Sequence, residues 1–353
     1  MFGQEVIIID NNNNPIHNAA VFNEDKSIYV LSDINGVVNL TRFSNNEKLF
    51  FQHPKYYINP IIKSLIVNNS NKFWVAEETL YEIEEVTLRN NQNTNNIKNS
   101  SAKKIFISKS RTFSMASFLF NKEKFQDITN LYFICRTLDD WTDTDNNEKL
   151  IELHQAIKNK EDHFILSEYR QLSDKYGVST EPLHLMVDTM IHEQNYLSIN
   201  NLDELIDYCK GVAGTVGWMI SPIIGVKNKE ALDYAISLGI AMQLTNIARD
   251  IYEDANNDRV YLPQEISGDQ LTPSAVLEMI ESNYTKIMIF KTNLLKLAKD
   301  YYNQGQQGFK YIPLRERFVI KWASLMYYHI GLNILENPNM YKYDKATVSI
   351  SKR

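Results

Sequence analysis

Two hydrophobic patterns divide the chain. Over residues 1–88, short β-branched and aromatic runs such as EVIIID, SIYVLSD, KLFFQHP and KSLIVNN alternate with turn-forming Asn, Asp, Pro and Gly. Runs of this length are typical of the strands of a small antiparallel β-sandwich. From residue 103 onwards, apolar residues instead recur at steps of three and four. We therefore predict an all-β sandwich domain over residues 1–88 and an all-α domain of about ten helices over residues 103–353.

A polar tract separates these two regions. The stretch RNNQNTNNIKNSSA, residues 89–102, is rich in Asn and Ser and contains almost no residue that could join a core. Such a composition favours an extended connection over a packed element. We predict a linker here.

Composition narrows the classes of function. The 353 residues are 44% hydrophobic with a formal net charge of −6, which argues against a nucleic-acid binder, since that class usually carries a basic surplus. Cys135 and Cys209 are far apart in apolar surroundings, so we expect buried thiols, and no zinc-ligand spacing is present. No apolar run approaches the ~18 residues of a membrane span. We expect a cytoplasmic protein whose membrane contact is at most peripheral, at the inner membrane.

A first acidic motif lies in the stretch CRTLDDWTD. Asp139 and Asp143 are four residues apart and so share a helix face, about one turn or ~6 Å apart. Asp140 lies one step around, and Arg136 one turn earlier. A lone acidic string of this kind is as often a solvated helix end. Here it follows the apolar LYFICR, and buried carboxylates are costly without a cation.

A second motif lies in QLTNIARDIYEDANNDRVYLP. Gln243, Asn246, Asp250 and Asp254 fall at i, i+3, i+7 and i+11, so they form one polar stripe along a helix. The apolar AISLGIAMQL just before it indicates that this helix is also central. Two such stripes in one all-α domain predict two walls that face each other across a cavity.

The chemistry of these groups favours a metal-bound diphosphate. Oxygen ligands alone suit a hard cation such as Mg²⁺, with Mn²⁺ as the alternative, that bridges carboxylates to phosphate oxygens. The helical spacing excludes a calcium loop, and these helices lack the Glu-x-x-His pairs of a di-iron bundle. Basic residues at the motif edges are candidate phosphate clamps: Lys109, Arg111, Arg136, Arg249 and Arg259.

Residues 103–353 resemble the squalene/phytoene synthase family of head-to-head prenyl transferases. The resemblance runs through five blocks in order: SKSRTFSMA, YFICRTLDDWTD, YCKGVAGTVGWMISPIIG, QLTNIARDIYEDANNDRVYLP and IPLRERFVIKWASLMYYHI. It implies the all-α isoprenoid-synthase fold (class I terpenoid synthase) with two aspartate-rich motifs around a central cavity. It also implies a Mg²⁺-dependent condensation of two prenyl diphosphates, for which geranylgeranyl diphosphate and a phytoene product, formed through a cyclopropylcarbinyl diphosphate, fit best.

The resemblance assigns roles residue by residue. It implies five catalytic residues: Asp139, Asp143, Asp250, Arg136 and Arg249. The implied metal ligands are Asp139, Asp140, Asp143, Asn246, Asp250 and Asp254. The implied substrate contacts are Ser110, Arg111, Thr112, Phe113, Tyr132, Tyr208, Val212, Ala213, Val216, Gly217, Gln243, Arg259, Tyr261 and Tyr327. Of these, the residues from Tyr208 to Gly217 would line a tunnel for the prenyl tail at a helix break.

Other readings stay open at this stage. A squalene or dehydrosqualene synthase would use farnesyl diphosphate, and NADPH would be needed only if the product is squalene. The stretch MIHEQNY (Met190–Tyr196), with His192 and Glu193, departs from the family's usual acidic string beside the substrate pocket. The length of the substrate's prenyl chain therefore stays open. The alternative from another class is a non-catalytic adaptor that keeps the fold.

The N-terminal region resembles a different domain. The segments NNPIHNAAVF and SIYVLSDINGVVNL are similar to those of carboxypeptidase-regulatory-like β-sandwiches. The resemblance implies a fusion in which the sandwich has a passive role or contacts a membrane partner. That partner is not identified by the sequence.

Overall fold

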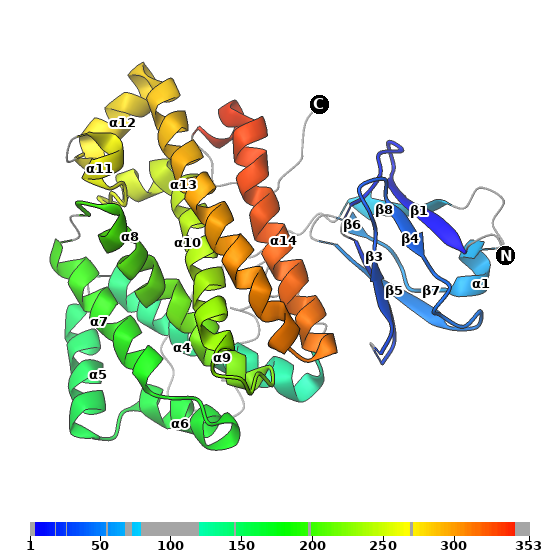
Figure 1. Ribbon diagram of the computed structural model, residues 1–353, viewed down its shortest axis with the longest axis horizontal. Coiled ribbons are helices and arrows are strands. Elements are labelled where there is room, and N and C mark those ends of the chain that lie inside the picture. Colours follow the sequence, from blue (N-terminus) through cyan, green and yellow to red (C-terminus); the bar gives the residue numbers. More distant parts are fainter. Residues whose placement is uncertain are drawn as a thin grey trace. The chain divides into compact units, whose positions relative to one another are not determined.

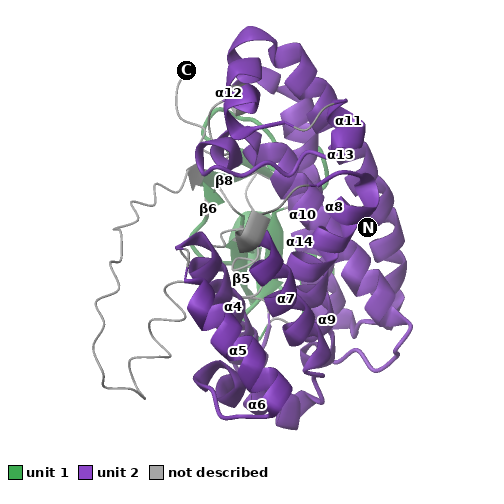
Figure 2. Cartoon of the chain, turned by 90° about the vertical axis from the view of Figure 1, so that its left-hand side faces the viewer, with its two compact units in different colours: residues 1–119 green, residues 120–353 purple. Residues whose placement is uncertain are grey.

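The computed structural model contains two compact units, residues 1–119 and 120–353 (Figure 2). It describes residues 4–17, 19–25, 27–53, 56–67, 73–78, 120–144, 146–196, 199–268 and 271–342. The predicted linker, residues 89–102, and the predicted start of the helical domain at residue 103 both lie outside the described residues. Those boundaries therefore stay predictions, and each unit is described below by itself.

The first unit is a β-sandwich. Its two four-stranded sheets have the orders β4-β1-β8-β6 and β3-β2-β5-β7. Its elements are β1 (Glu5–Asp10), β2 (Ala20–Asn23), β3 (Tyr29–Leu31), β4 (Val37–Asn39), β5 (Lys48–Gln52), β6 (Tyr56–Tyr57), β7 (Ile61–Ile62), α1 (Lys63–Val67) and β8 (Phe73–Glu78). Both sheets contribute to one hydrophobic core, which includes Val6 and Trp74 from one sheet and Val21 and Leu49 from the other. The predicted sandwich is confirmed.

Two details of the sandwich differ from the prediction. The sheet is not purely antiparallel, because β1 pairs with β8 in parallel, with Ile7 opposite Phe73. The run KSLIV is the short helix α1 rather than a strand. Its buried residues, Lys63 and Ile66, are three apart, a helical rather than an alternating spacing. The Lys63 ammonium group donates a hydrogen bond of 2.5 Å to the carbonyl oxygen of Phe43, which satisfies its buried charge.

The second unit is helical throughout its described residues (Figure 1). Its α-helices are α4 (Lys122–Asp143), α5 (Asn147–Asn159), α6 (Phe164–Tyr176), α7 (Glu181–Tyr196), α8 (Leu202–Cys209), α9 (Thr215–Ile223), α10 (Ala231–Asn256), α11 (Gln264–Ser267), α12 (Pro273–Ser282), α13 (Tyr284–Gln306) and α14 (Leu314–Glu336). They are joined by the π-helical turn η1 (Lys210–Gly214) and the 3₁₀ turns η2 (Gln307–Tyr311) and η3 (Pro338–Tyr341). The predicted all-α fold of this region is confirmed.

Helix α10 lies at the centre of this unit. It packs against α8, α9, α12, α13, α14 and η1, whereas α4 packs against α5, α6, α7 and α9. Its buried positions include Leu238, Ala241, Leu244 and Ile251, which follow the three- and four-residue steps read from the sequence. The two helices that carry the acidic motifs are therefore both interior, as predicted, and both contact α9.

The helix break expected between Tyr208 and Gly217 is a π-helical turn and not an irregular loop. Helices α8 and α9 are joined without interruption by the π-turn η1, whose flanking residues Cys209 and Thr215 keep helical backbone angles. The glycines here permit close contact between helices. A Cβ atom on Gly217 would lie 2.3 Å from the carbonyl oxygen of Ala235, and one on Gly239 would lie 2.3 Å from that of Ala213. Glycine at these positions lets the backbones of α9, η1 and α10 touch.

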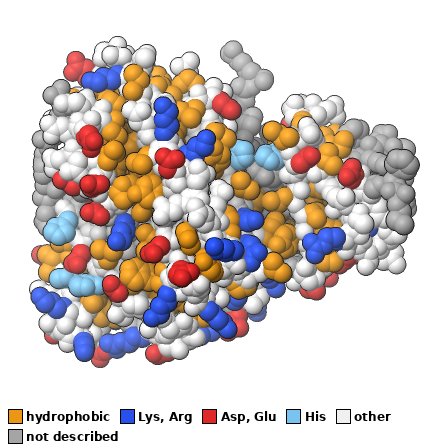
Figure 3. All heavy atoms as spheres, in the orientation of Figure 1, with side chains coloured by type: hydrophobic (Ala, Val, Ile, Leu, Met, Phe, Trp, Pro, Cys, Tyr) orange, Lys and Arg blue, Asp and Glu red, His pale blue; other side chains and the backbone are white. Residues whose placement is uncertain are grey.

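Three further features of the chain are the character of its helices, its surface and its two cysteines. Among the described residues, no helix combines the length and the apolar character that crossing a bilayer requires. On the face shown in Figure 3, charged and hydrophobic side chains are interspersed. Cys209 is buried and Cys135 half-buried, and both are free thiols, so no disulfide joins them.

We predict that Gly217→Ala destabilises the helical unit. The added methyl group would meet backbone atoms of α10, which cannot move aside as a side chain can. The overpacking should outweigh the ~1 kcal/mol gain in helix propensity and lower the free energy of unfolding by about 1–3 kcal/mol. Denaturant unfolding, monitored by circular dichroism, measures this difference in the free energy of unfolding between the variant and wild type.

The matched control for this experiment is Gly331→Ala in α14. Its added Cβ would meet a side-chain tip, Cδ2 of Leu295 at 3.0 Å, which can rotate away. This control should be nearly neutral. Equal effects of the two substitutions would contradict the close helix contact at Gly217.

Candidate active site

The first acidic motif occupies the C-terminal end of α4. The helix begins at the N-cap Asn121, whose side chain accepts a hydrogen bond from the backbone N–H of Lys124, and it buries Ile134, Leu138 and Trp141. Three aspartates then gather where the helix dipole is negative, and the last turn contains no basic residue. This arrangement is unfavourable by itself and requires positive charge from elsewhere.

Arg136 supplies part of that charge. Its guanidinium lies 2.6 Å from Asp139 Oδ2 and 2.6 Å from Asp140 Oδ1. Burial nevertheless raises the pKa of Asp139 to about 6; Arg136 opposes the shift, and the neighbouring Asp143, Glu193 and Asp140 add to it. The half-buried Tyr132, one turn before Arg136, has its pKa raised to about 12 mainly by burial. The first motif is thus crowded with negative charge that one arginine only partly offsets.

The second motif lies along the C-terminal half of α10. Asn246 Nδ2 donates a hydrogen bond of 3.3 Å to Gln243 Oε1, while Asn246 Oδ1 is buried and has no hydrogen-bond partner. Arg249 donates two hydrogen bonds to Asp250, from Nε at 2.7 Å and from Nη2 at 2.6 Å. At Asp250 the backbone leaves helical values (φ −100°, ψ 15°), so that α10 is kinked inside the motif.

Tyr327 and Lys291 adjoin this pair from other helices. Burial raises the pKa of Tyr327 in α14, with Arg249 opposing the shift and Asp250 adding to it. Lys291 in α13 is only 2% exposed, and its burial lowers its pKa to about 8, with Asp250 opposing. Lys291 was missed by sequence reasoning, because on α13 it is one lysine among several and only the packing of α13 on α10 buries it.

Arg259 connects the second motif to the first. It follows Asp258, whose left-handed backbone (φ 58°) turns the chain after α10, and its own N–H donates to the carbonyl oxygen of Asp254 at 2.9 Å. Its Nη1 donates to Asp143 Oδ1 at 2.7 Å, and its Nη2 donates to the carbonyl oxygen of Thr142 at 3.4 Å. Arg259 therefore closes the gap between the ends of α10 and α4.

A buried acid from α7 extends this contact. Glu193, whose side chain is 8% exposed, lies 4.0 Å from Arg259 Nη1 and accepts a hydrogen bond of 2.5 Å from the hydroxyl of Tyr261. Burial raises the pKa of Glu193, and Tyr261, Arg259 and Tyr208 oppose that shift. The ring of Tyr208 stacks on that of Tyr261, with 5.0 Å between the centroids. Sequence reasoning noted Glu193 beside the pocket but did not include it in the site.

The other predicted site residues lie at the end of α10, in η1 and α9, or outside the described residues. Asp254 lines a small pocket at the end of α10 together with Arg259 and Tyr261. Val212 and Ala213 in η1, and Val216 and Gly217 in α9, are half-buried, and their tunnel-lining role stays a prediction. Ser110, Arg111, Thr112 and Phe113, with Lys109, lie outside the described residues.

The six predicted metal ligands are not gathered into one cluster. In the part of the chain that the structure describes, no three carboxylates of the two motifs have oxygens within 4.8 Å of one another. Four of these aspartates are instead ion-paired: Asp139 and Asp140 with Arg136, Asp143 with Arg259, and Asp250 with Arg249. The donor set nevertheless suits a hard divalent cation, because it is made of oxygens alone and Asn246 Oδ1 is buried without a partner.

Comparison with known families decides the classification. Residues 108–353 match the model of the squalene/phytoene synthase family. The chain belongs to the squalene/phytoene synthase family. This assignment confirms the resemblance seen in the five sequence blocks, and the matched residues include the whole helical unit, 120–353.

Individual relatives within the squalene/phytoene synthase family are distant. Phytoene synthase 1 of Zea mays is 29% identical over 67% of this chain, and 15-cis-phytoene synthase of Enterobacter agglomerans is 29% identical over 64%. 4,4'-Diapophytoene synthase of Staphylococcus haemolyticus is 27% identical over 69% of this chain and 89% of its own length. The match spans 60% of the Zea mays protein and 82% of the Enterobacter protein.

Solved structures support the same fold. A dehydrosqualene synthase bound to a ligand matches with a TM-score of 0.62 and 25% identity, over 70% of this chain and 89% of that one. The squalene synthase HpnC of Alicyclobacillus acidocaldarius matches with a TM-score of 0.56 and 18% identity, over 68% and 94% of the two chains. The helical unit thus has the terpenoid-synthase fold that was predicted.

We predict that Lys291→Met stabilises the protein at neutral pH. Below about pH 8, Lys291 is charged in both folded and unfolded chains, so the folded protein bears the part of the burial cost that the attraction of Asp250 does not offset. Between about pH 8 and its ordinary pKa of 10.5, only the unfolded chain keeps the proton, so this cost fades as the pH rises. The variant should exceed wild type by about 1–3 kcal/mol at pH 7, and the difference should shrink towards pH 10.

Denaturant unfolding at pH 7, 8.5 and 10 measures this difference. Lys299→Met, an exposed lysine on the same helix, is the matched control and should show no pH-dependent difference from wild type. A Lys291→Met variant that is less stable than wild type at pH 7 would refute the buried-charge assignment.

Proposed function

We propose that the helical unit catalyses the Mg²⁺-dependent head-to-head condensation of two prenyl diphosphates. The preferred substrate is geranylgeranyl diphosphate and the product phytoene, formed through a cyclopropylcarbinyl diphosphate. The proposal rests above all on one observation: Arg259, which follows the second acidic motif, is ion-paired with Asp143 of the first. The two motifs therefore form one site. The names of the Zea mays and Enterobacter agglomerans relatives support phytoene as the product.

The arginines have a second task in this proposal. When Mg²⁺ is bound by the carboxylates and by Asn246 Oδ1, it would neutralise the leaving diphosphate and so assist cleavage of the carbon–oxygen bond. Arg136, Arg249 and Arg259 now neutralise those same carboxylates. Once the carboxylates bind the metal, the guanidinium groups of the three arginines become free to pair with phosphate oxygens. The planar guanidinium group is well suited to this pairing.

The surrounding side chains suit the carbon chemistry. Ionisation of one allylic diphosphate leaves a carbocation that the double bond of the second substrate attacks, and the cyclopropyl product then ionises again and rearranges to a linear hydrocarbon. Such cations require walls that exclude water and present π-electrons. Tyr132 and Tyr327 stand beside the two motifs on α4 and α14, half-buried, and can supply those walls.

A second candidate within the same chemistry uses farnesyl diphosphate. It is favoured by the likeness to the dehydrosqualene synthase structure and to the diapophytoene synthase. The buried acid Glu193, which accepts a hydrogen bond from Tyr261, stands where the family usually has a different acidic string, so the length of the prenyl chain is the point on which the two candidates differ. The adaptor alternative predicts no product at all.

A product assay separates these candidates. The full chain is incubated with Mg²⁺ and either geranylgeranyl or farnesyl diphosphate, with and without NADPH, and the extracted hydrocarbons are identified by mass spectrometry. We expect phytoene from the longer substrate without NADPH. Dehydrosqualene or squalene from farnesyl diphosphate alone would select the second candidate. A folded protein that forms no product from either substrate would overturn the enzyme proposal.

We predict that Asn246→Leu separates activity from stability. The variant removes a proposed metal ligand and should lower turnover by roughly 10²–10³-fold. Because Asn246 Oδ1 is buried without a partner in the folded chain, its loss should leave the melting temperature unchanged or raised. Turnover at saturating Mg²⁺ and thermal unfolding are measured together. Asn293→Leu, an exposed site on α13, is the control, and a fully active Asn246→Leu would refute the role of this amide.

A further inference from the structure

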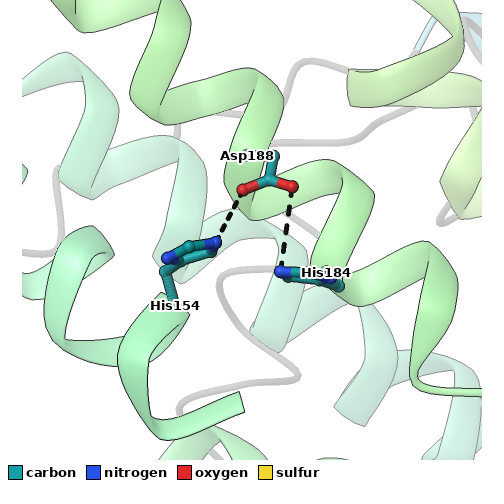
Figure 4. A group of neighbouring side chains, drawn as sticks. All are labelled: His154, His184 and Asp188. Atoms are coloured by element: carbon teal, nitrogen blue, oxygen red, sulfur yellow. Dashed lines mark ion pairs between the residues drawn. The ribbon is translucent and has the colours of Figure 1, made fainter. Parts of the chain in front are cut away.

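A group of two histidines and one aspartate lies apart from the acidic motifs, where α5 packs against α7 (Figure 4). It consists of His154 from α5, and His184 and Asp188, one turn apart on α7. In Figure 4 both imidazole rings face the carboxylate of Asp188. His154 Nε2 lies 2.9 Å from Asp188 Oδ1, and His184 Nε2 lies 3.7 Å from Asp188 Oδ2. Within the described residues, one nitrogen or oxygen from each of the three lies within 4.8 Å of the others.

The packing of the two helices holds these residues in place. Helix α5 buries Leu150, Leu153 and Ala156, and α7 buries Leu183 and Val187, so the two backbones are fixed on either side of the group. The three side chains are neither fully buried nor fully exposed. Binding an ion would therefore require side-chain adjustment around His184 but no movement of the helices that carry the group.

One atom of the group is left unsatisfied. His184 Nε2 is shielded from solvent and has no hydrogen-bond partner, since 3.7 Å is too long for a hydrogen bond to Asp188. The rings of His154 and His184 are stacked, with 5.0 Å between their centroids and 23° between their planes. A buried nitrogen without a partner costs stability unless a ligand satisfies it.

We propose that His154, His184 and Asp188 bind a divalent transition-metal ion of the Zn²⁺ class. Two imidazole nitrogens and one carboxylate oxygen are a donor set that Zn²⁺ accepts, with water as the fourth ligand. Bonds of ~2.0–2.1 Å in a tetrahedron place ligand atoms about 3.3 Å apart, close to the two distances found here. Mg²⁺ prefers oxygen ligands alone, so this site and the acidic motifs select different ions.

The ion would clamp α5 to α7. Helix α7 also carries Glu193, the buried acid that accepts a hydrogen bond from Tyr261 beside the acidic motifs. The ion would lie about 1.4 to 2.5 turns from Glu193 along the same helix, because Asp188 and His184 precede Glu193 by five and nine residues. Its effect is to stabilise the helix pair rather than to take part in a chemical step. The inference stands whether or not the proposed prenyl transfer is correct.

Cobalt titration tests the proposal directly. Full-length protein without a histidine tag is stripped with chelator and titrated with Co²⁺ in excess Mg²⁺, which keeps the acidic motifs occupied. We expect one Co²⁺ per chain, with visible absorption bands that disappear when Zn²⁺, but not further Mg²⁺, is added. Zn²⁺ should also raise the melting temperature by several degrees, because binding to the folded state alone stabilises it. Wild-type protein that takes up no Co²⁺ under these conditions overturns the proposal.

Variants on both helices locate the ion. His184→Gln and Asp188→Asn on α7, and His154→Gln on α5, should each weaken Co²⁺ binding at least tenfold and abolish the rise in melting temperature with Zn²⁺. His192→Gln, an exposed histidine two turns along α7 from His184, is the matched control and should bind as wild type does. Circular dichroism without metal checks that each variant is folded. Uptake by His154→Gln and His184→Gln that equals wild type would refute the site.

Discussion

Negative charge collected at two helix ends is the constraint around which the helical unit is organised. Asp139, Asp140 and Asp143 crowd the C-terminal turn of α4, where the helix dipole already favours cations, and the largely buried carboxylate of Asp250 lies at the kink inside α10. Carboxylates in such positions need counter-charges. Three arginines provide them, and one of these, Arg259, does so across the gap between the two helices. The same pairing that makes the charges tolerable therefore also joins the ends of the two motif helices.

Close packing around α10 fixes the positions of the helices that surround the two acidic motifs. Glycines at positions 217 and 239 let the backbones of α9, η1 and α10 touch, and the π-turn keeps α8 and α9 a single element. Helix α7 then brings Glu193 to the hydroxyl of Tyr261, which lies two residues after Arg259. The network on one side of the site and the proposed metal clamp between α5 and α7 therefore share a helix.

Local spacing was enough to predict much of this site. The pairing of Arg136 with Asp139 and Asp140 follows from steps of three and four residues on one helix, and the stripe from Gln243 to Asp254 follows from the same geometry. The two-part organisation followed from a change in hydrophobic period. Predictions failed where local signals were ambiguous: KSLIV is helical, and β1 and β8 are parallel.

By itself the sequence determined the fold class and the polar face of each motif helix, because helix periodicity and side-chain type are local properties, and its five motif blocks carried the resemblance to the family. Only the tertiary structure decided which side chains from different helices contact one another. Arg259 and Asp143 are 116 residues apart in the chain, and His154 and His184 belong to different helices. Lys291 became a buried charge only because α13 packs on α10. Contacts of this kind depend on where helices cross and on bends such as the kink at Asp250, and no spacing within one helix encodes them.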